Sequence, residues 1–394
     1  MSDWETKEIK QLGRVVTGKT PPTNSPEFFG GEHLFVSPKD LDWNSYYITE
    51  TKTRITAKAL DKFKNQVLPR NAVMFTSLSF AFGKMGIASR PCLTNQQINS
   101  IIVNEENSSK FVYYLLKAYE PIIFSYNSGI DTPIVPKSVF EGIDVKIPSK
   151  KLQKKIAAIL SAYDDLIENN QRRIALLEKM AEEIYREWFV RMRFPGHEKV
   201  KKVKGVPEGW EVRWVADLVD RKRFGQIYRE SELLPEGAVI VIDQSTKEWL
   251  GFHEGKAEHQ ASPDRPLILF GDHSCKMQLM IEPFSLAENV IPFTSKGEMP
   301  IIFLYYLVHS LVETTEYKRH WTDLITKQVF VPTSSLQVQF DERVRNLIVM
   351  ARHLKLANAN LGKTRDRLLP RLISGKLSVE HLDIQFPPGM EDRP

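Results

Sequence analysis

The sequence predicts an α+β fold in which two mixed α/β domains are separated by two long helices, as an internal repeat with pseudo-twofold character. Three observations support this prediction. Residues 147 to 189 resemble residues 331 to 373 at a fixed offset, both halves open on the same short motif, and strand-like runs recur between these anchors. A period this long indicates duplication of whole domains rather than a solenoid.

The opening motif has identical spacing in both halves: Trp4-Glu5 with Ile9 and Leu12, and Trp210-Glu211 with Val215 and Leu218. Strand-like runs follow at 34–36, 73–76, 98–103 and 143–147, and again at 239–242, 267–270, 290–291 and 328–331. Helical apolar spacing covers 110–119 and 300–311. We therefore predict mixed α/β domains at residues 1–147 and 209–332.

Each repeated segment begins with an X-Pro bond and a hydroxyl residue, Pro148-Ser149 or Pro332-Thr333, which indicates a strand end followed by a helix cap. We predict helices at 148–190 and 333–375, a basic linker at 191–208 and a tail at 376–394. Apolar residues at heptad spacing predict a seam between the helices, with these members: Leu152, Ile156, Ile159, Tyr163, Leu166, Leu177, Ile184, Leu336, Phe340, Leu347, Leu354, Leu361 and Leu368.

A helix of about 40 residues is about 60 Å long, more than one small domain needs for its core. The helices are therefore predicted to hold the two domains apart. The alternative, a core helix of one larger globule, fits a sustained heptad pattern less well. Asn170 stands on the predicted seam, where a buried polar residue would fix the register of the pair.

Composition is that of an ordinary globular protein: 394 residues and 42% hydrophobic content are enough for a core in each domain. No run approaches the roughly 20 apolar residues of a membrane helix, and the first residues lack a secretory pattern. Cys92 and Cys275 fall in different halves, so no disulfide framework is expected. We expect a cytoplasmic protein.

Charge alone does not decide the function. The formal net charge is +5, with a mildly basic first half and an acidic second domain that carries the basic run Arg221-Lys222-Arg223. Such a run is more often a solvated surface than a phosphate site, and both interpretations stay open.

The sequence contains no recognisable catalytic motif. It lacks the glycine-rich phosphate loops of nucleotide and dinucleotide sites. His253, His259, His273 and Cys275 do not have zinc-ligand spacing, and the adjacent Asp272-His273-Ser274 seldom gives the geometry of a nucleophile and its base. We therefore expect no catalytic residues, no metal site and no methyl transfer by this chain alone.

Taken together, the motifs resemble the specificity subunits of type I restriction-modification systems over nearly the whole chain. The motifs are the two Trp-x7-Leu openings, the run Val-Met-Phe-Thr-Ser to Thr-Asn-Gln-Gln-Ile at 73–98, the Ile-Pro-Ser-x-x-Leu-Gln start of the central helix, and the segment Arg-Leu-Ile-Ser-Gly-Lys-Leu at 371–377. Their order and duplication make the match specific.

The resemblance implies two target-recognition domains, each reading half of a bipartite asymmetric site in double-stranded DNA. It implies that the two helices, conserved in that family, pair as an antiparallel coiled coil and set the spacer between the half-sites. It also implies two modification subunits that bind S-adenosylmethionine and methylate adenine, and restriction subunits that use ATP and Mg²⁺ to cleave DNA. No cofactor is expected on this chain.

Loop residues of suitable type provide the predicted DNA contacts, because Lys, Arg, Asn, Gln, Ser and Thr match phosphates and base edges. Two alternatives stay open: a stand-alone two-headed DNA-binding regulator, and an enzyme with an unrecognised centre. The predicted DNA-binding residues are Lys19, Thr20, Lys39, Ser77, Lys84, Asn95 and Gln96 in the first domain, and Arg221, Lys222, Arg223, Gln244, Lys276 and Asn289 in the second.

Overall fold

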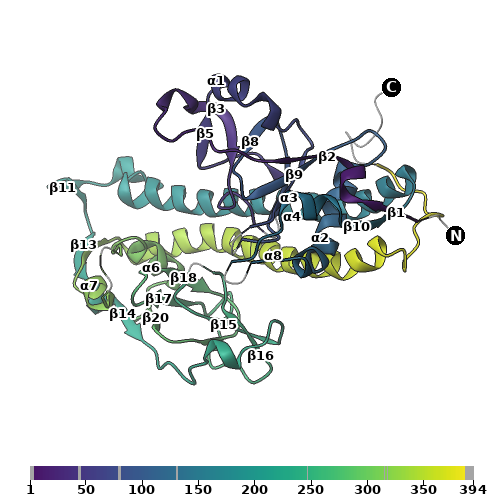
Figure 1. The fold of residues 1–394 in the computed structure, drawn as a ribbon. Helices are drawn as coiled ribbons and strands as arrows, with labels where there is room; N and C mark the ends of the chain where they lie inside the picture. The colour runs from purple at the N-terminus through teal and green to yellow at the C-terminus, as the bar shows by residue number, and fades with distance from the viewer. Residues whose placement is uncertain are drawn as a thin grey trace. The chain divides into compact units, whose positions relative to one another are not determined.

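The computed structural model describes residues 4–42, 46–78, 81–129, 132–245, 247–314, 316 and 318–386. The chain divides into two compact units, which we call the first and second unit. The first unit contains Met1–Asn169 and Asn358–Pro394, and the second contains Asn170–Ala357. Both long helices therefore contribute one part to each unit (Figure 1).

The first unit contains a five-stranded and a three-stranded sheet. The larger has the order β2 (Gly13–Thr17), β9 (Ile98–Val103), β6 (Val73–Thr76), β7 (Met85–Ala88) and β4 (Tyr47–Ile48). Its strands pair antiparallel except β4, which runs parallel to β7. The smaller has the order β5 (Thr53–Ile55), β3 (Phe29–Val36) and β8 (Cys92–Thr94). β1 (Glu5–Glu8) pairs with β10 (Asp144–Ile147), and the helices are α1 (Ala57–Lys62), α2 (Ser109–Ser125) and α3 (Lys137–Glu141).

Over the residues that the structure describes, the second unit repeats this topology with one strand fewer in its larger sheet. Its larger sheet has the order β14 (Val219–Arg221), β20 (Val290–Ser295), β17 (Leu267–Gly271) and β18 (Met277–Met280). Its smaller sheet has the order β16 (Gly251–His253), β15 (Val239–Ile242) and β19 (Phe284–Leu286). β13 (Glu211–Trp214) pairs with β21 (Gln328–Val331), β11 (Lys202–Val203) pairs with β12 (Val206–Pro207), and the helices are α5 (Val215–Leu218), α6 (Ile301–Val308) and α7 (Trp321–Ile325).

Hydrogen bonds repeat along with the strands. Glu5 pairs with Ile147 in the first unit, and the equivalent Glu211 pairs with Val331 in the second. The strand and helix predictions made from the apolar patterns are confirmed, and the duplication seen in the sequence is a duplication of the fold.

The long helices are α4 (Lys150–Tyr185), which continues as a π-helical turn at Arg186–Val190, and α8 (Ser334–Ile373). Both begin with the same contact: Gln153 Nε2 donates to the Pro148 carbonyl at 3.0 Å, and Gln337 Nε2 donates to the Pro332 carbonyl at 2.8 Å. This contact satisfies a carbonyl just before each helix and explains the repeated Leu-Gln pair. In the described part of the chain, no helix combines the length and apolar character needed to span a bilayer.

Segments of α4 and α8 pair antiparallel inside each unit, as predicted, because contact positions rise along α4 while they fall along α8. In the first unit Arg365 pairs with Asp164, and Asn358 Nδ2 donates to the Ile167 carbonyl at 3.3 Å. In the second unit Lys355 and Glu178 form an ion pair at 2.8 Å.

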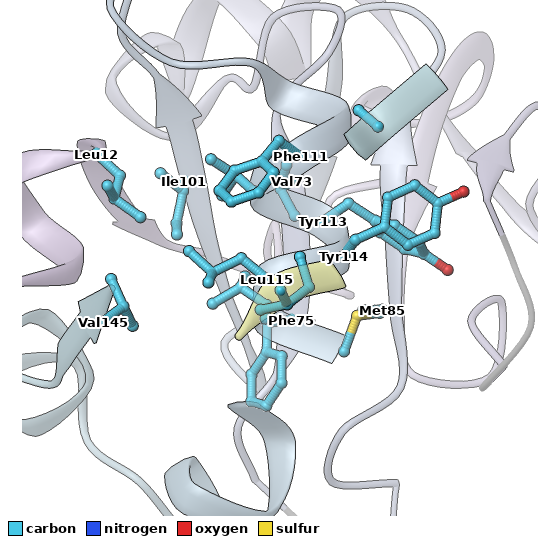
Figure 2. Close-up of a cluster of buried hydrophobic side chains, with 14 of the residues drawn as sticks. Leu12, Val73, Phe75, Met85, Ile101, Phe111, Tyr113, Tyr114, Leu115 and Val145 are labelled. Atoms are coloured by element: carbon cyan, nitrogen blue, oxygen red, sulfur yellow. The ribbon is translucent and has the colours of Figure 1, made fainter. Parts of the chain in front are cut away.

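Each hydrophobic core includes side chains from both long helices. The first core surrounds Phe75, Phe111 and Tyr114 (Figure 2) and is closed by Leu152, Ile156 and Leu160 of α4 with Leu369, Leu372 and Ile373 of α8. The second core includes Ala181 of α4 with Leu336, Phe340 and Val344 of α8. Neither core is complete without a segment contributed by the other half of the chain.

The heptad pattern correctly predicted the two long helices, but it predicted only in part which of their side chains are buried. Leu152, Ile156, Leu336 and Phe340 are buried, whereas Leu166 is 51% exposed, so its predicted place in a buried seam is wrong. The apolar residues of each helix are divided between the partner helix and the adjacent sheet domain, so they do not form one seam. The division of the chain into two compact units does not test the predicted boundaries of the six segments, which remain predictions.

A buried ion pair links the helices of the first unit to its core. The Arg365 guanidinium contacts the Asp164 carboxylate, and the Tyr114 hydroxyl of α2 donates to the other oxygen of that carboxylate. Both charged side chains are buried. Removing one partner leaves an uncompensated buried charge, which is more costly than replacing both.

We predict that Arg365→Met destabilises the first unit by about 3–5 kcal/mol. The double variant Asp164→Leu/Arg365→Met should recover most of this loss, because no charge is then left unpaired. Hydrogen exchange of peptides from α2 in the full chain measures the effect. Equal exchange in the single and double variants would contradict the role assigned to the pair.

Candidate nucleic-acid interface

Three of the predicted contact residues of the first unit lie together at one end of its sheets. The turn between β8 and β9 is held by the Asn95 amide, which donates to the Val36 carbonyl at 3.0 Å. The Thr20 hydroxyl donates to Gln96 Oε1 at 2.8 Å, so the loop after β2 lies against the same turn. The structure thus brings Thr20, Asn95 and Gln96 together from segments that are far apart in the sequence.

The β6–β7 hairpin lies beside this turn and adds two predicted residues. The Ser77 amide donates to the Gln97 carbonyl at 3.0 Å, and the Thr76 amide donates to the Lys84 carbonyl at 2.8 Å. Lys84 is half-buried at the hairpin. We call this group, Thr20, Lys84, Asn95, Gln96 and Gln97, the first loop cluster.

Ser77 is not available for the contact that we predicted. Its side chain is 4% exposed, and its hydroxyl accepts a hydrogen bond from Asn99 Nδ2 at 2.8 Å. Asn99 also accepts a hydrogen bond from the Thr17 hydroxyl at 2.7 Å. The prediction for Ser77 is therefore wrong. The residue directly after β6 points inward, where it bonds to Asn99 beneath the loops.

Gly18 allows the loop after β2 to approach the turn. A Cβ at this position would lie 2.1 Å from the Asn95 carbonyl oxygen and 2.2 Å from Thr94 Oγ1, so any side chain would displace the turn. Sequence analysis missed Gly18 and Gln97. The signal for Gly18 was its place between a strand and a Lys-Thr-Pro-Pro loop.

Lys19 and Lys39 are exposed on the loops after β2 and β3. Lys19 Nζ lies 5.7 Å from the centre of the Phe63 ring, a cation–π arrangement. The loop that bears Lys39 is held by Asp40, whose carboxylate accepts from the Ser37 amide and the Lys52 amide at 2.9 and 2.8 Å. The two ammonium groups thus stand on loops with fixed backbones.

The second unit has an equivalent cluster at its β17–β18 hairpin. The Gly271 amide donates to the Lys276 carbonyl at 2.8 Å, as Thr76 does to Lys84, so Lys276 is the counterpart of Lys84. The Asp272 amide donates to the Asn289 carbonyl at 2.9 Å, as Ser77 does to Gln97. Two predicted residues of the second domain therefore take the places of two members of the first loop cluster.

Gln244 completes the second loop cluster, which we define as Gln244, Lys276 and Asn289. Its side-chain oxygen accepts from the His273 amide at 3.0 Å. The Lys276 ammonium donates to the Lys247 carbonyl. Burial lowers the pKa of Lys276, while the nearby Asp243 and Glu248 carboxylates act in the opposite direction. The cluster thus contains a half-buried cation together with the Gln244 and Asn289 amide side chains, and the Asp243 and Glu248 carboxylates lie near the cation.

The basic run Arg221-Lys222-Arg223 takes a different place. Arg221 ends β14, and its guanidinium lies 4.9 Å from the centre of the Phe224 ring, while Lys222 Nζ pairs with Asp220 at 2.6 Å. By strand register these residues correspond to Val15 to Thr17 on β2, before the loop that carries Lys19. They are exposed cations at the end of β14 and directly after it, and they are not members of the loop cluster.

His253 and His259 of the second unit hold neighbouring segments through hydrogen bonds. His253 Nε2 bonds to the Ser285 hydroxyl at 2.9 Å, and its Nδ1 accepts from the Gly255 amide at 3.0 Å. His259 Nε2 bonds to the Phe224 carbonyl at 3.0 Å. Over the residues that the structure describes, no three His, Cys, Asp or Glu side chains gather as a metal site would require.

Comparison with known proteins finds similarity to specificity subunits of type I restriction enzymes. Residues 1–179 match the family model described as the type I restriction modification DNA specificity domain. The chain is 28% identical to the type I restriction enzyme MjaIX specificity subunit of Methanocaldococcus jannaschii, over 96% of this chain and 95% of that protein. It is 30% identical to the HindI specificity subunit of Haemophilus influenzae over 178 residues, which are 43% of this chain and 38% of that protein.

A solved structure supports the fold. The crystal structure of the type I restriction-modification S subunit from M. genitalium superposes with a TM-score of 0.62 at 18% sequence identity, over 94% of this chain and 96% of that chain. The comparisons confirm the resemblance to type I specificity subunits and the predicted fold class. Both curated relatives are named as specificity subunits of type I restriction enzymes.

Proposed function

Because the chain is related along its length to specificity subunits of type I restriction enzymes, we propose that it recognises a bipartite asymmetric DNA site for such a system. Each unit carries one target-recognition domain, which reads one half-site. The helix pair sets the spacer and binds two modification subunits, and restriction subunits join the complex in the same system. The observation that carries the proposal is the occurrence of one loop cluster at the same topological place in both units.

The chemistry of the clusters suits DNA. Lys84 and Lys276 provide cations at equivalent hairpins, and such groups bind phosphates without regard to sequence. The side-chain amides of Asn95, Gln96 and Gln244 have both donors and acceptors, which match the edges of bases in the major groove. Loops that differ between the units would then read different half-sites, which explains an asymmetric target.

The helices supply the second part of the proposal. They carry large apolar side chains that are exposed in this chain: Leu176 and Met180 on α4, and Met350 and Leu356 on α8. Exposed apolar residues on paired helices favour contact with another protein. We assign this surface to the modification subunits, which would bring S-adenosylmethionine to the DNA that the two domains hold.

Coexpression with the modification subunit encoded beside this chain tests the proposal. We expect adenine methylation across host DNA at a two-part motif, and its loss when this chain is omitted. Exchanging residues 1–146 for those of another specificity subunit should replace one half of the motif only. Methylation that does not depend on this chain would overturn the proposal and favour a stand-alone DNA-binding regulator.

We further predict that Lys84→Ala and Lys276→Ala each weaken DNA binding by the assembled complex to a similar degree. Each should lower the slope of log affinity against log salt by about one, because each removes one phosphate contact. Fluorescence anisotropy at several salt concentrations measures the slope.

Lys10→Ala is the matched control, because Lys10 is an exposed cation that precedes β2, whereas the loop cluster follows it. Its salt slope should stay that of the unsubstituted chain. An unchanged slope for both Lys84→Ala and Lys276→Ala would remove the hairpins from the proposed interface.

A further inference from the structure

The two units differ at one edge of their larger sheets. In the first unit, β4 pairs parallel with β7 and closes that edge, with Tyr47 facing Ile87 and Ile48 facing Ala88. In the second unit, β18 holds the position of β7, and no strand in the described part of the chain pairs with its outer side. β18 is therefore an open edge with backbone groups available for pairing.

The sequence shows why the strand is missing. β3 and β5 correspond to β15 and β16, because Phe35 pairs with Thr53 as Val241 pairs with Gly251. The connection that contains β4 in the first unit is residues 37–52, and the corresponding connection in the second unit, 243–250, is half as long. The shorter connection has no residues equivalent to those that form β4 in the first unit.

The missing strand leaves a groove of about 690 Å³ beside β18. One wall is β18 itself, from Met277 to Met280, and another is formed by Tyr305 and Tyr306 of α6. Apolar side chains of the two long helices, including Leu177, Ala181, Leu347 and Ile348, line its inner side. All of these residues belong to the second unit.

The first unit shows what fills this space. Tyr46, next to β4, lies 5.3 Å from Tyr113 and 5.9 Å from Tyr114 between ring centres, and the Tyr46 carbonyl accepts from the Ile87 amide at 2.7 Å. Tyr113 and Tyr114 are fully buried there. Their counterparts Tyr305 and Tyr306 are half-buried, and Tyr306 stacks on the Tyr185 ring of α4 at 5.8 Å between ring centres.

The two grooves differ in where their charged side chains lie. In the second unit, Arg352 lines the groove and pairs with Glu248 and Glu282, which line it as well. In the first unit, the Asp164–Arg365 ion pair lies beneath Tyr114. The positions equivalent to these two residues in the second unit are Ile348 and Ala181. At these two positions the groove is apolar, whereas its counterpart in the first unit carries buried charges.

We propose that this groove binds an extended segment of a partner polypeptide, which adds to the open edge of β18 as a strand and places an aromatic side chain against Tyr305 and Tyr306. The Leu279 amide, equivalent to that of Ile87, donates to the carbonyl of the guest. Main-chain pairing supplies affinity and the aromatic site supplies selectivity. This inference is independent of the DNA-binding proposal, since it rests on the comparison of the two units alone.

The chain itself provides a probe with the required chemistry, a synthetic peptide of residues 40–50. Methyl NMR of the full chain labelled at methionine reports binding at Met277 and Met280, which line the groove, with Met74 and Met85 of the first unit as internal controls. We expect saturable shifts at Met277 and Met280 alone. A matched peptide with Tyr46→Ala should bind about tenfold more weakly, because it lacks the aromatic contact.

Leu279→Pro removes the backbone donor and should abolish the shifts. The alanine peptide needs no change to the protein, so it decides the question even where this variant fails to fold. The absence of shifts at Met277 and Met280, or equal binding of the two peptides, would overturn the proposal. Shifts that include Met74 and Met85 would do the same, because the peptide would then not be selective for the groove.

Discussion

Closure of each hydrophobic core by both long helices is the constraint on which the rest of the structure depends. The first core needs Leu160 of α4 and Leu372 of α8, and the second needs Ala181 of α4 and Phe340 of α8. Each sheet domain therefore packs on helical segments from both halves of the chain. The helices are parts of both cores and also connect them, which supports the proposal that they set the spacer.

Duplication then explains both what the units share and where they differ. Equivalent backbone hydrogen bonds place Lys84 and Lys276 at matching hairpins, although the surrounding loops have little sequence in common. The connection after the first strand of the smaller sheet is shorter in the second unit. In the described residues of that unit, no strand takes the place of β4 at the edge of the larger sheet. One topology thus supports two loop surfaces and one additional groove.

Much of the fold could be predicted, because apolar periodicity and X-Pro boundaries are local signals. The strands, the long helices and the duplication followed from them. Which side chains of the helices are buried could not be predicted in the same way. Leu166 has the heptad spacing of a buried residue, yet its side chain is exposed. The apolar residues of each helix are divided between the partner helix and the sheet domain. Residue type alone also gave a wrong prediction at Ser77. A serine side chain can contact DNA, but this one is buried and its hydroxyl accepts a hydrogen bond from Asn99. Gly18 depends on a close approach between loops that no local pattern reveals.

The central claim is that the helix pair sets the distance between two half-sites. Inserting seven residues into α4 near Ile174 and seven into α8 near Asn358 would lengthen both helices by about 10 Å while keeping the heptad faces. Methylation mapping of the complex then reports the spacer. The account predicts a spacer longer by about three base pairs, at 3.4 Å each, with both half-sites unchanged. An unchanged spacer, with methylation intact, would contradict it.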